Sequence, residues 1–239
     1  MAEMEEETVK ESIKKLGEKF KHNPLDFTVE TSIVAELQEI MKRKIESEEI
    51  EIKARYDDFN KNSEHEADYT NYKERYLKRI CNQDEISKVQ IEVNIGKKGK
   101  NRLLDLAVLN DDTKIYLING TKYFDKESIE HAVEVKFVKN KNIAPTTLEK
   151  LNENNGSLDE NNFLEGDLKK LKELDKADSR HLVIFSNKNI FQKEVEGESK
   201  DEVNNYERFT KEAHRRIDAL VDYCDDKDIK VYHYFPLTE

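Results

Sequence analysis

Residues 102–110, RLLDLAVLN, and residues 131–137, HAVEVKF, decide the fold that we expect for this chain. Both are apolar runs of strand length. The first carries one carboxylate, Asp105, and the second carries Glu134 and Lys136. Short apolar runs bounded by polar turns are typical of buried strands. Charged side chains are rarely buried unless they are paired or bind a metal ion. The two runs therefore predict strands of a hydrophobic sheet that carries a polar site.

Alternation along the second run separates the polar side chains from the apolar ones. Side chains in a strand point to opposite faces with a period of two, so Glu134 and Lys136 share one face. We expect the opposite face to pack in the core with Val133, Val135 and Phe137. One face of this strand is thus predicted to pack in the core and the other to carry the functional side chains.

Asp105 and Glu134 are suited to hold Mg²⁺, because carboxylate oxygens are ligands that this ion prefers. Cleaving a phosphodiester needs a hydroxide near neutral pH and stabilisation of charge on the phosphate, and a bound metal supplies both. Lys136 can then orient the attacking water or stabilise the developing charge. The alternative is a solvated Glu-x-Lys pair with a cross-strand ion pair. The apolar surroundings of Glu134 and Lys136 favour the metal site.

The order of these residues resembles the PD-(D/E)xK nuclease superfamily, which has the restriction-endonuclease-like fold. The resemblance rests on Asp105, the intervening residues 106–133, and the Glu-Val-Lys sequence that begins at Glu134. It covers roughly residues 28–187, with a helix before the motif and a helix and a strand after it. Leu104 stands where the family name places proline, but many members lack that proline.

The resemblance implies specific roles for four residues. Asp105 and Glu134 would bind Mg²⁺ or, in its place, Mn²⁺, and the backbone carbonyl of Val135 would add a ligand. Lys136 would be the catalytic lysine. In this family an upstream helix frequently contributes a further glutamate, and the family includes members that have lost catalysis.

Residues 27–44, FTVETSIVAELQEIMKRK, predict an amphipathic helix, which is the candidate for the upstream helix that contributes a glutamate. Its apolar stripe comprises Ile33, Val34, Leu37, Ile40 and Met41. Glu30 falls near the middle of this stripe and Glu36 towards its edge. A core-facing carboxylate is costly unless it meets a cation, so Glu30 is our first choice and Glu36 our second. Alternatively, Glu30 complements the helix dipole and Glu36 is exposed to solvent.

Composition indicates a soluble, helix-rich α/β chain, with 239 residues, 39% charged residues and no tryptophan. No run approaches the roughly 18 apolar residues of a membrane-spanning helix, and the start MAEMEEE does not resemble a signal peptide. We therefore expect a cytoplasmic protein without a membrane partner. Cys81 and Cys224 are too few for a disulfide framework and favour reduced structural thiols over a zinc site.

The rest of the chain predicts one nuclease-like domain over residues 1–239, with its core at about 28–45 and 88–239 and a charged helical insertion at about 46–80. Further helices are expected at 7–21, 167–176 and 209–226, and a polar loop at 140–162. Strands at 89–95, 102–110, 114–119 and 131–138 predict an antiparallel meander, followed by strands at 180–187 and 229–235. The expected fold class is α/β (α+β), a mixed central sheet flanked by helices.

A net charge of −11 should repel nucleic acid overall, but two basic segments flank the proposed metal site. They are expected to bind a phosphate backbone and comprise Lys97, Lys98, Lys100 and Arg102, then Lys139 and Lys141. The alternative is a set of ordinary solubilising lysines. A third basic group alternates with acidic residues in the manner of a solvated helix face: Lys169, Lys170 and Lys172.

Histidines offer little competing chemistry. His131 lies on the face opposite Glu134 and His181 begins another strand, so we interpret both as structural. His214 lies beside two arginines, where it contacts substrate or is simply exposed. The sequence has no GxxxxGK[ST], GxSxG or HExxH motif, which disfavours an NTPase, an α/β-hydrolase and a zincin.

The sequence and the resemblance together predict a Mg²⁺-dependent endonuclease that acts on DNA in restriction or defence. One alternative is a catalytically inactive nuclease-like module that binds a protein partner, which the acidic composition would suit. Another is a nuclease of the same chemistry that acts on RNA or branched DNA. A homodimer is a further hypothesis, because cutting both strands of a duplex is simplest with two sites.

Overall fold

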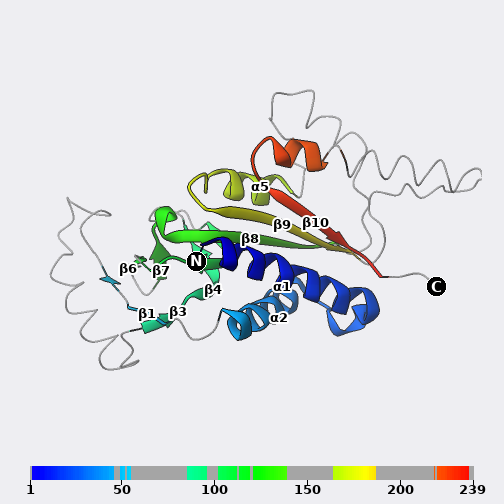
Figure 1. Ribbon diagram of the computed structural model, residues 1–239, viewed down its shortest axis with the longest axis horizontal. Coiled ribbons are helices and arrows are strands. Elements are labelled where there is room, and N and C mark those ends of the chain that lie inside the picture. The colour runs from blue at the N-terminus through cyan, green and yellow to red at the C-terminus, as the bar shows by residue number, and fades with distance from the viewer. Residues whose placement is uncertain are drawn as a thin grey trace, which may run out of the picture.

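A five-stranded mixed sheet forms the centre of the computed structural model (Figure 1). The structure describes residues 2–45, 49–51, 53–54, 85–95, 102–111, 113–118, 121–138, 164–186, 218 and 220–236. The strand order is β10–β9–β8–β5–β4. These strands are β4 (Val89–Asn94), β5 (Leu103–Leu109), β8 (Ile129–Val138), β9 (Ser179–Ser186) and β10 (Lys230–Tyr234). Strands β4, β5 and β8 run antiparallel, whereas β8, β9 and β10 run parallel. The predicted mixed sheet flanked by helices is confirmed.

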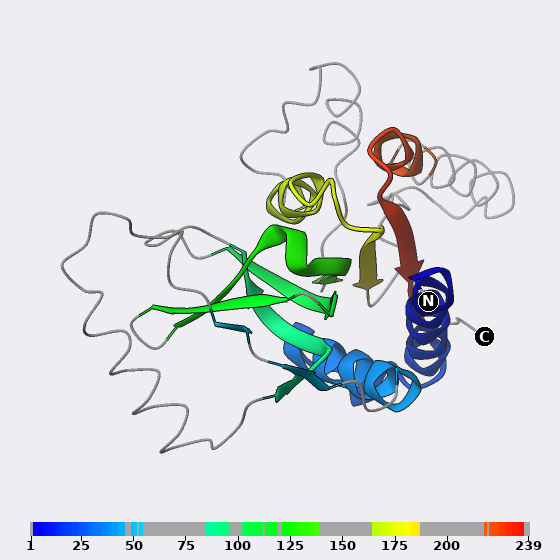
Figure 2. The ribbon, with the colours of Figure 1, turned by 60° about the vertical axis from the view of Figure 1, so that its left-hand side comes forward.

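Helices cover both faces of this sheet (Figure 2). Helices α1 (Ala2–His22) and α2 (Glu30–Lys44) lie on one face, connected through the 3₁₀ turn η1 (Pro24–Asp26). Their apolar stripes pack against the strands, and the buried apolar side chains of α1 are Val9, Ile13, Leu16 and Phe20. Helix α5 (Glu165–Lys172) and the helical residues 220–225 cover the other face. Helix α1 is therefore part of the core, which the sequence placed at residues 28–45 and 88–239.

Alternation along β8 divides its side chains between these two layers as predicted. Val133, Val135 and the partly buried Phe137 pack with α1 and α2, whereas Ala132 and Val138 pack with α5. Because helices cover both faces, β8 is buried along most of its length. Central strands of this kind are near-continuously apolar, which explains why a charged residue in β8 is conspicuous in the sequence.

Two smaller sheets correct the predicted strand arrangement. Strand β6 (Lys114–Ile118) pairs with β7 (Thr121–Phe124) and β2 (Lys53–Ala54) in a sheet of its own, outside the meander. The 3₁₀ turn η3 (Lys126–Ser128) leads from that hairpin into β8, which pairs with β5 in its place. Strand β1 (Glu49–Glu51) pairs with β3 (Glu85–Ser87). The predicted helical insertion at 46–80 thus begins with strands. Residues 55–80 and the loop at 140–162 lie outside the described residues.

A buried hydrogen-bonded chain joins β8 to β9 beneath α1. The Oγ of Ser179 lies 2.8 Å from Nδ1 of His131 and 2.8 Å from Nε2 of His181. Both imidazoles are fully buried. Burial lowers the pKa of His131, and it lowers the pKa of His181 to about 3. Both histidines are therefore neutral parts of the packed structure, in agreement with their structural interpretation.

Helix α1 approaches β10 closely at Gly17. A Cβ atom at this position would lie 2.1 Å from the ring of Tyr234, which stacks on Phe185 with 5.5 Å between ring centroids. No side chain fits in that space without displacing the ring or the helix. The glycine is thus required by packing, although it lowers intrinsic helix stability.

We expect Gly17→Ala to destabilise the protein by about 1–3 kcal/mol, the usual cost of overpacking a core. Gly166→Ala is the matched control, because a Cβ at that position of α5 would meet nothing within 4 Å. That control should stabilise the chain by about 0.5–1 kcal/mol through helix propensity. Urea unfolding measures both values. A Gly17→Ala protein as stable as the Gly166→Ala protein would contradict the close approach of α1 and β10.

Candidate functional site

The site begins where β5 and β8 stop pairing. The two strands pair from Leu109 to Leu106, whose partner is Val133. One more residue of the same register would place Asp105 opposite Glu134, but no pairing continues there. Instead, the backbone N–H of Val135 donates to Oδ2 of Asp105 at 2.7 Å. A side-chain carboxylate thus occupies the place of a backbone acceptor at the point where the ladder opens.

The alternation of β5 is also interrupted at Asp105. Leu104 packs on the α5 side of the sheet and Leu106 on the α1 side, although residues two apart in a strand normally share a face. In the neighbouring strand, Glu92 has a φ of 52°, an uncommon conformation for a residue other than glycine. Burial raises the pKa of Asp105, and the hydrogen bond from Val135 partly offsets that rise.

Glu134 is the most constrained group of the site, because its side chain is 0% exposed in the middle of β8. Burial raises the pKa of its carboxyl to about 10, and the neighbouring Asp105 charge acts in the same direction. Its Oε2 accepts a hydrogen bond from Nζ of Lys170 at 2.6 Å. Its Oε1 is also buried and, among the described residues, accepts no hydrogen bond.

Two lysines and one further carboxylate surround Glu134. The Nζ of Lys170 also donates to the carbonyl of Leu103 at 2.9 Å and lies 3.2 Å from Oδ1 of Asp167. The Nζ of Lys136 lies 3.1 Å from Oδ2 of Asp167. Lys136 and Glu134 therefore share the α5 side of β8, as the alternation predicted. Helix α5 supplies both counter-charges, since Asp167 faces Lys136 and Lys170 faces Glu134.

Both lysines are held in the charged form. Burial acts to lower the pKa of Lys136, but the carboxylates of Asp167 and Glu30 outweigh it and raise that pKa. Burial likewise acts to lower the pKa of Lys170, and Glu134 and Asp167 outweigh it. Two ammonium groups are thus fixed beside a pair of carboxylates that are costly to ionise.

Glu30, rather than Glu36, is the helix glutamate that reaches this site. Its Oε2 accepts a hydrogen bond from the backbone N–H of Phe137 at 2.8 Å and lies 3.8 Å from Nζ of Lys136. Its side chain is 36% exposed, so it does not face the core as the apolar stripe suggested. The reason is its position at the first residue of α2. Glu36 pairs with Lys19 of α1 at 2.8 Å.

Sequence reasoning missed Asp167 and Lys170. Lys170 was interpreted as part of a solvated face, and that interpretation is wrong, because its side chain is only 18% exposed and contacts Glu134. The sequence around these two residues carries a weak local indication that they lie near the core. Asp167 and Lys170 each directly precede a buried leucine of α5, Leu168 or Leu171, so their spacing of three places them beside its packed stripe.

The remaining predicted binding residues are only partly described. Arg102 forms an ion pair with Glu173, which also pairs with Lys126 at 2.8 Å. Five predicted phosphate-binding residues lie outside the described residues: Lys97, Lys98, Lys100, Lys139 and Lys141. His214 and Cys81 lie outside them as well. Cys224 is a buried free thiol whose pKa burial raises to about 12, so it is inert.

Comparisons with protein-family models, with curated proteins and with solved structures find no match for this chain. Within the described ranges, no helix has the length and apolar character needed to cross a membrane. Function is therefore inferred from the chemistry of the site.

That chemistry fits a hard divalent cation. Asp105 and Glu134 offer oxygen ligands, which Mg²⁺ and Mn²⁺ prefer. The buried Oε1 of Glu134 has no hydrogen bond to satisfy it within the described part of the chain. Lys170 already compensates Oε2, and a divalent ion would in addition satisfy Oε1. The residues present are therefore those expected of a metal site.

We expect Glu134→Gln to stabilise the metal-free protein by about 1 kcal/mol or more, because it removes a buried carboxyl whose ionisation is penalised by burial and by Asp105. Thermal unfolding in EDTA at mildly alkaline pH should show a Tm rise of about 2–4 °C per kcal/mol. Glu173→Gln is the control, because ion pairs with Arg102 and Lys126 lower the pKa of that carboxyl against the opposing effect of burial. It should leave Tm unchanged or lower it. A lower Tm for Glu134→Gln than for the wild type would contradict this description.

Proposed function

We propose that this chain is a Mg²⁺-dependent nuclease that hydrolyses phosphodiester bonds of DNA. The observation that carries the proposal is the buried carboxyl group of Glu134, which lies beside Asp105 and shares its side of the sheet with Lys136. Its Oε2 pairs with Lys170, whereas its Oε1 accepts no hydrogen bond among the described residues. The presence of α2 before the motif and of α5 and β9 after it supports the proposal, because the resemblance to the PD-(D/E)xK superfamily includes a helix before the motif and a helix and a strand after it. A role in restriction or defence belongs to the same proposal.

Asp105, Glu134 and the carbonyl of Val135 would hold the ion. Bound Mg²⁺ would supply a hydroxide near neutral pH and stabilise negative charge on the phosphate. The N–H of Val135 fixes Asp105 in place, so the carboxylate needs little reorganisation to act as a ligand. The burial of Glu134 excludes water from its oxygens and strengthens every charge interaction around them.

Lys136 is the residue best placed to act on the substrate. Asp167 and Glu30 hold its ammonium group from two sides, at 3.1 Å and 3.8 Å, and keep it charged. A positioned cation of this kind stabilises negative charge that develops on a phosphate oxygen or orients the attacking water. Lys170 has a different role, because its ammonium group compensates the negative charge of Glu134 directly in the metal-free protein.

The 2.6 Å ion pair between Lys170 and Glu134 also supports a second candidate function. If that pair is permanent, the ammonium takes the place of a metal ion and the fold serves as a binding module without catalysis. The net charge of −11 would suit a basic protein partner better than nucleic acid. The two candidates differ in one property, namely whether a divalent ion displaces Lys170 from Glu134.

Cleavage of supercoiled plasmid with Mg²⁺ or Mn²⁺ tests the nuclease proposal. We expect Asp105→Asn and Lys136→Met to lower the rate by about 100-fold or more, as expected when a metal ligand or a charge-stabilising group is lost. Lys169→Met is the matched control, because Lys169 is exposed on α5 and should leave the rate unchanged. Linear duplex, single-stranded DNA, branched DNA and RNA identify the substrate class. Metal-independent cutting, or cutting that survives Asp105→Asn, would contradict the proposed site.

A second pair of variants separates the two helix glutamates. Glu30→Gln should lower the cleavage rate by about tenfold or more, because Glu30 contacts both Lys136 and the backbone beside it. Glu36→Gln should leave the rate within about twofold, since it removes only a half-exposed ion pair with Lys19. Equal losses of activity in both variants would show that Glu30 has no special part in the site.

A further inference from the structure

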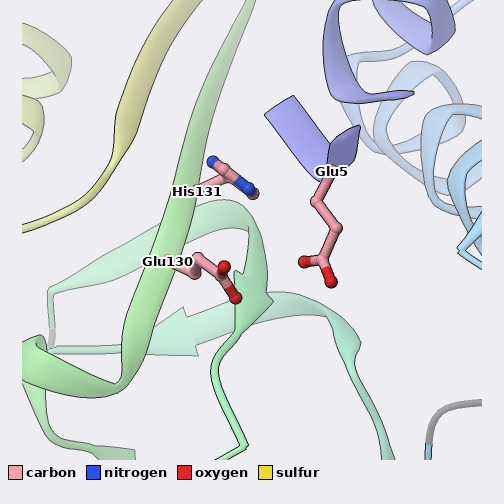
Figure 3. Close-up of side chains that lie close together, drawn as sticks. All are labelled: Glu5, Glu130 and His131. Carbon is pink, nitrogen blue, oxygen red and sulfur yellow. The ribbon is translucent and has the colours of Figure 1, made fainter. Parts of the chain in front are cut away.

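A second cluster of metal-ligating side chains lies on the opposite side of β8. It comprises Glu5 from α1 with Glu130 and His131 from the start of β8, and Figure 3 shows the three side chains converging between these elements. One ligand atom from each residue lies within 4.8 Å of the other two. His131 packs beneath α1, whereas Glu134 faces α5, so this cluster is separate from the proposed nuclease site.

Two buried atoms in the cluster lack partners among the described residues: Oε2 of Glu5 and Nε2 of His131. His131 is 0% exposed and Glu5 is 8% exposed, so solvent does not satisfy either atom. The other imidazole nitrogen of His131, Nδ1, lies 2.8 Å from Oγ of Ser179. Histidines that bind metals usually hydrogen-bond through the second ring nitrogen in this way, which fixes the ring and leaves the first nitrogen to the ion.

Lys88 is the cation already present at this cluster, and it leaves a formal excess of negative charge. Its Nζ lies 2.8 Å from Oε1 of Glu5, 3.5 Å from Oε2 of Glu130 and 3.6 Å from Oδ1 of Asp111. Among the described residues, three carboxylates facing this ammonium carry two formal negative charges in excess of it, which a divalent ion would neutralise. Lys88 donates to Oε1 of Glu5, whereas Oε2 accepts no hydrogen bond among the described residues, so one carboxylate can bind the lysine and an ion together.

We propose that Glu5, Glu130 and His131 bind a divalent transition metal ion of the Zn²⁺ type. Imidazole with two carboxylates is a ligand set that Zn²⁺ accepts, whereas Mg²⁺ and Ca²⁺ prefer oxygen ligands alone. The ion joins the first turns of α1 to the start of β8, two segments far apart in the sequence. Its role is structural, and it does not depend on the proposed nuclease activity.

Zinc binding by the full-length, untagged chain tests this site. The experiment uses Asp105→Asn as the parent protein, so that the other candidate metal site is disabled. After EDTA treatment, Zn²⁺ should bind with a stoichiometry of about one in calorimetry and raise Tm. Adding Glu5→Gln or His131→Gln should weaken Zn²⁺ binding by about tenfold or more and remove most of the Tm rise. Glu7→Gln is the matched control on α1, because Glu7 is exposed and should bind Zn²⁺ like the parent.

Three results would overturn the proposal. The first is an unchanged Zn²⁺ affinity in Glu5→Gln, a conservative change in the first turns of α1 that should still fold even if His131→Gln does not. The second is an equal loss of affinity in the Glu7→Gln control. The third is no Zn²⁺ binding by the Asp105→Asn parent, which would identify Lys88 as the cation that this cluster uses.

Discussion

The burial of one carboxylate, that of Glu134, is the constraint on which the arrangement of this site depends. A carboxylate removed from water in the middle of a strand is costly unless a cation or a proton reaches it. Burial raises the pKa of this group to about 10, even with the ammonium of Lys170 only 2.6 Å away. Helix α5 supplies the charges that surround it: Lys170 pairs with Glu134, and Asp167 pairs with Lys170 and Lys136.

Strand β8 carries two polar clusters because it is covered on both faces. Alternation sends Glu134 towards α5 and His131 towards α1, and each meets charged partners from the helix that covers it. Most other side chains along the strand are apolar and packed. The strand thus carries two polar clusters of different composition, with carboxylates and lysines on one side and an imidazole with carboxylates on the other.

The parts of the site that sequence reasoning could find are those governed by local periodicity. Alternation in residues 131–138 was enough to assign Glu134 and Lys136 to one face, and the stripe of α2 was enough to predict its buried residues. The mixed sheet also followed from the order of the strands. The nuclease function and the family resemblance stay predictions, because they concern chemistry that the fold alone does not decide.

The parts that sequence reasoning missed are set by contacts between distant segments. Lys170 looks solvated in a helix of alternating charges, and only packing against β8 brings it to Glu134. Glu5 meets Glu130 and His131 because α1 packs across the sheet, which no local pattern indicates. The hairpin β6–β7 has strand-like sequence, yet β8 takes the place beside β5 and leaves that hairpin in a separate sheet. These three features are therefore set by tertiary contacts, which the local sequence patterns do not contain.

The protonation state of Glu134 is the most direct test of this account. Isotope-edited NMR of the glutamate side-chain carboxyl carbons, with Glu134→Gln to assign the signal, would follow its titration with and without Mg²⁺. Without Mg²⁺ the carboxyl should stay protonated well above neutral pH, and its pKa should fall sharply when Mg²⁺ is added, because the ion replaces the proton. A Glu134 pKa near the ordinary glutamate value, unmoved by Mg²⁺, would contradict both the buried carboxylate and the metal site built around it.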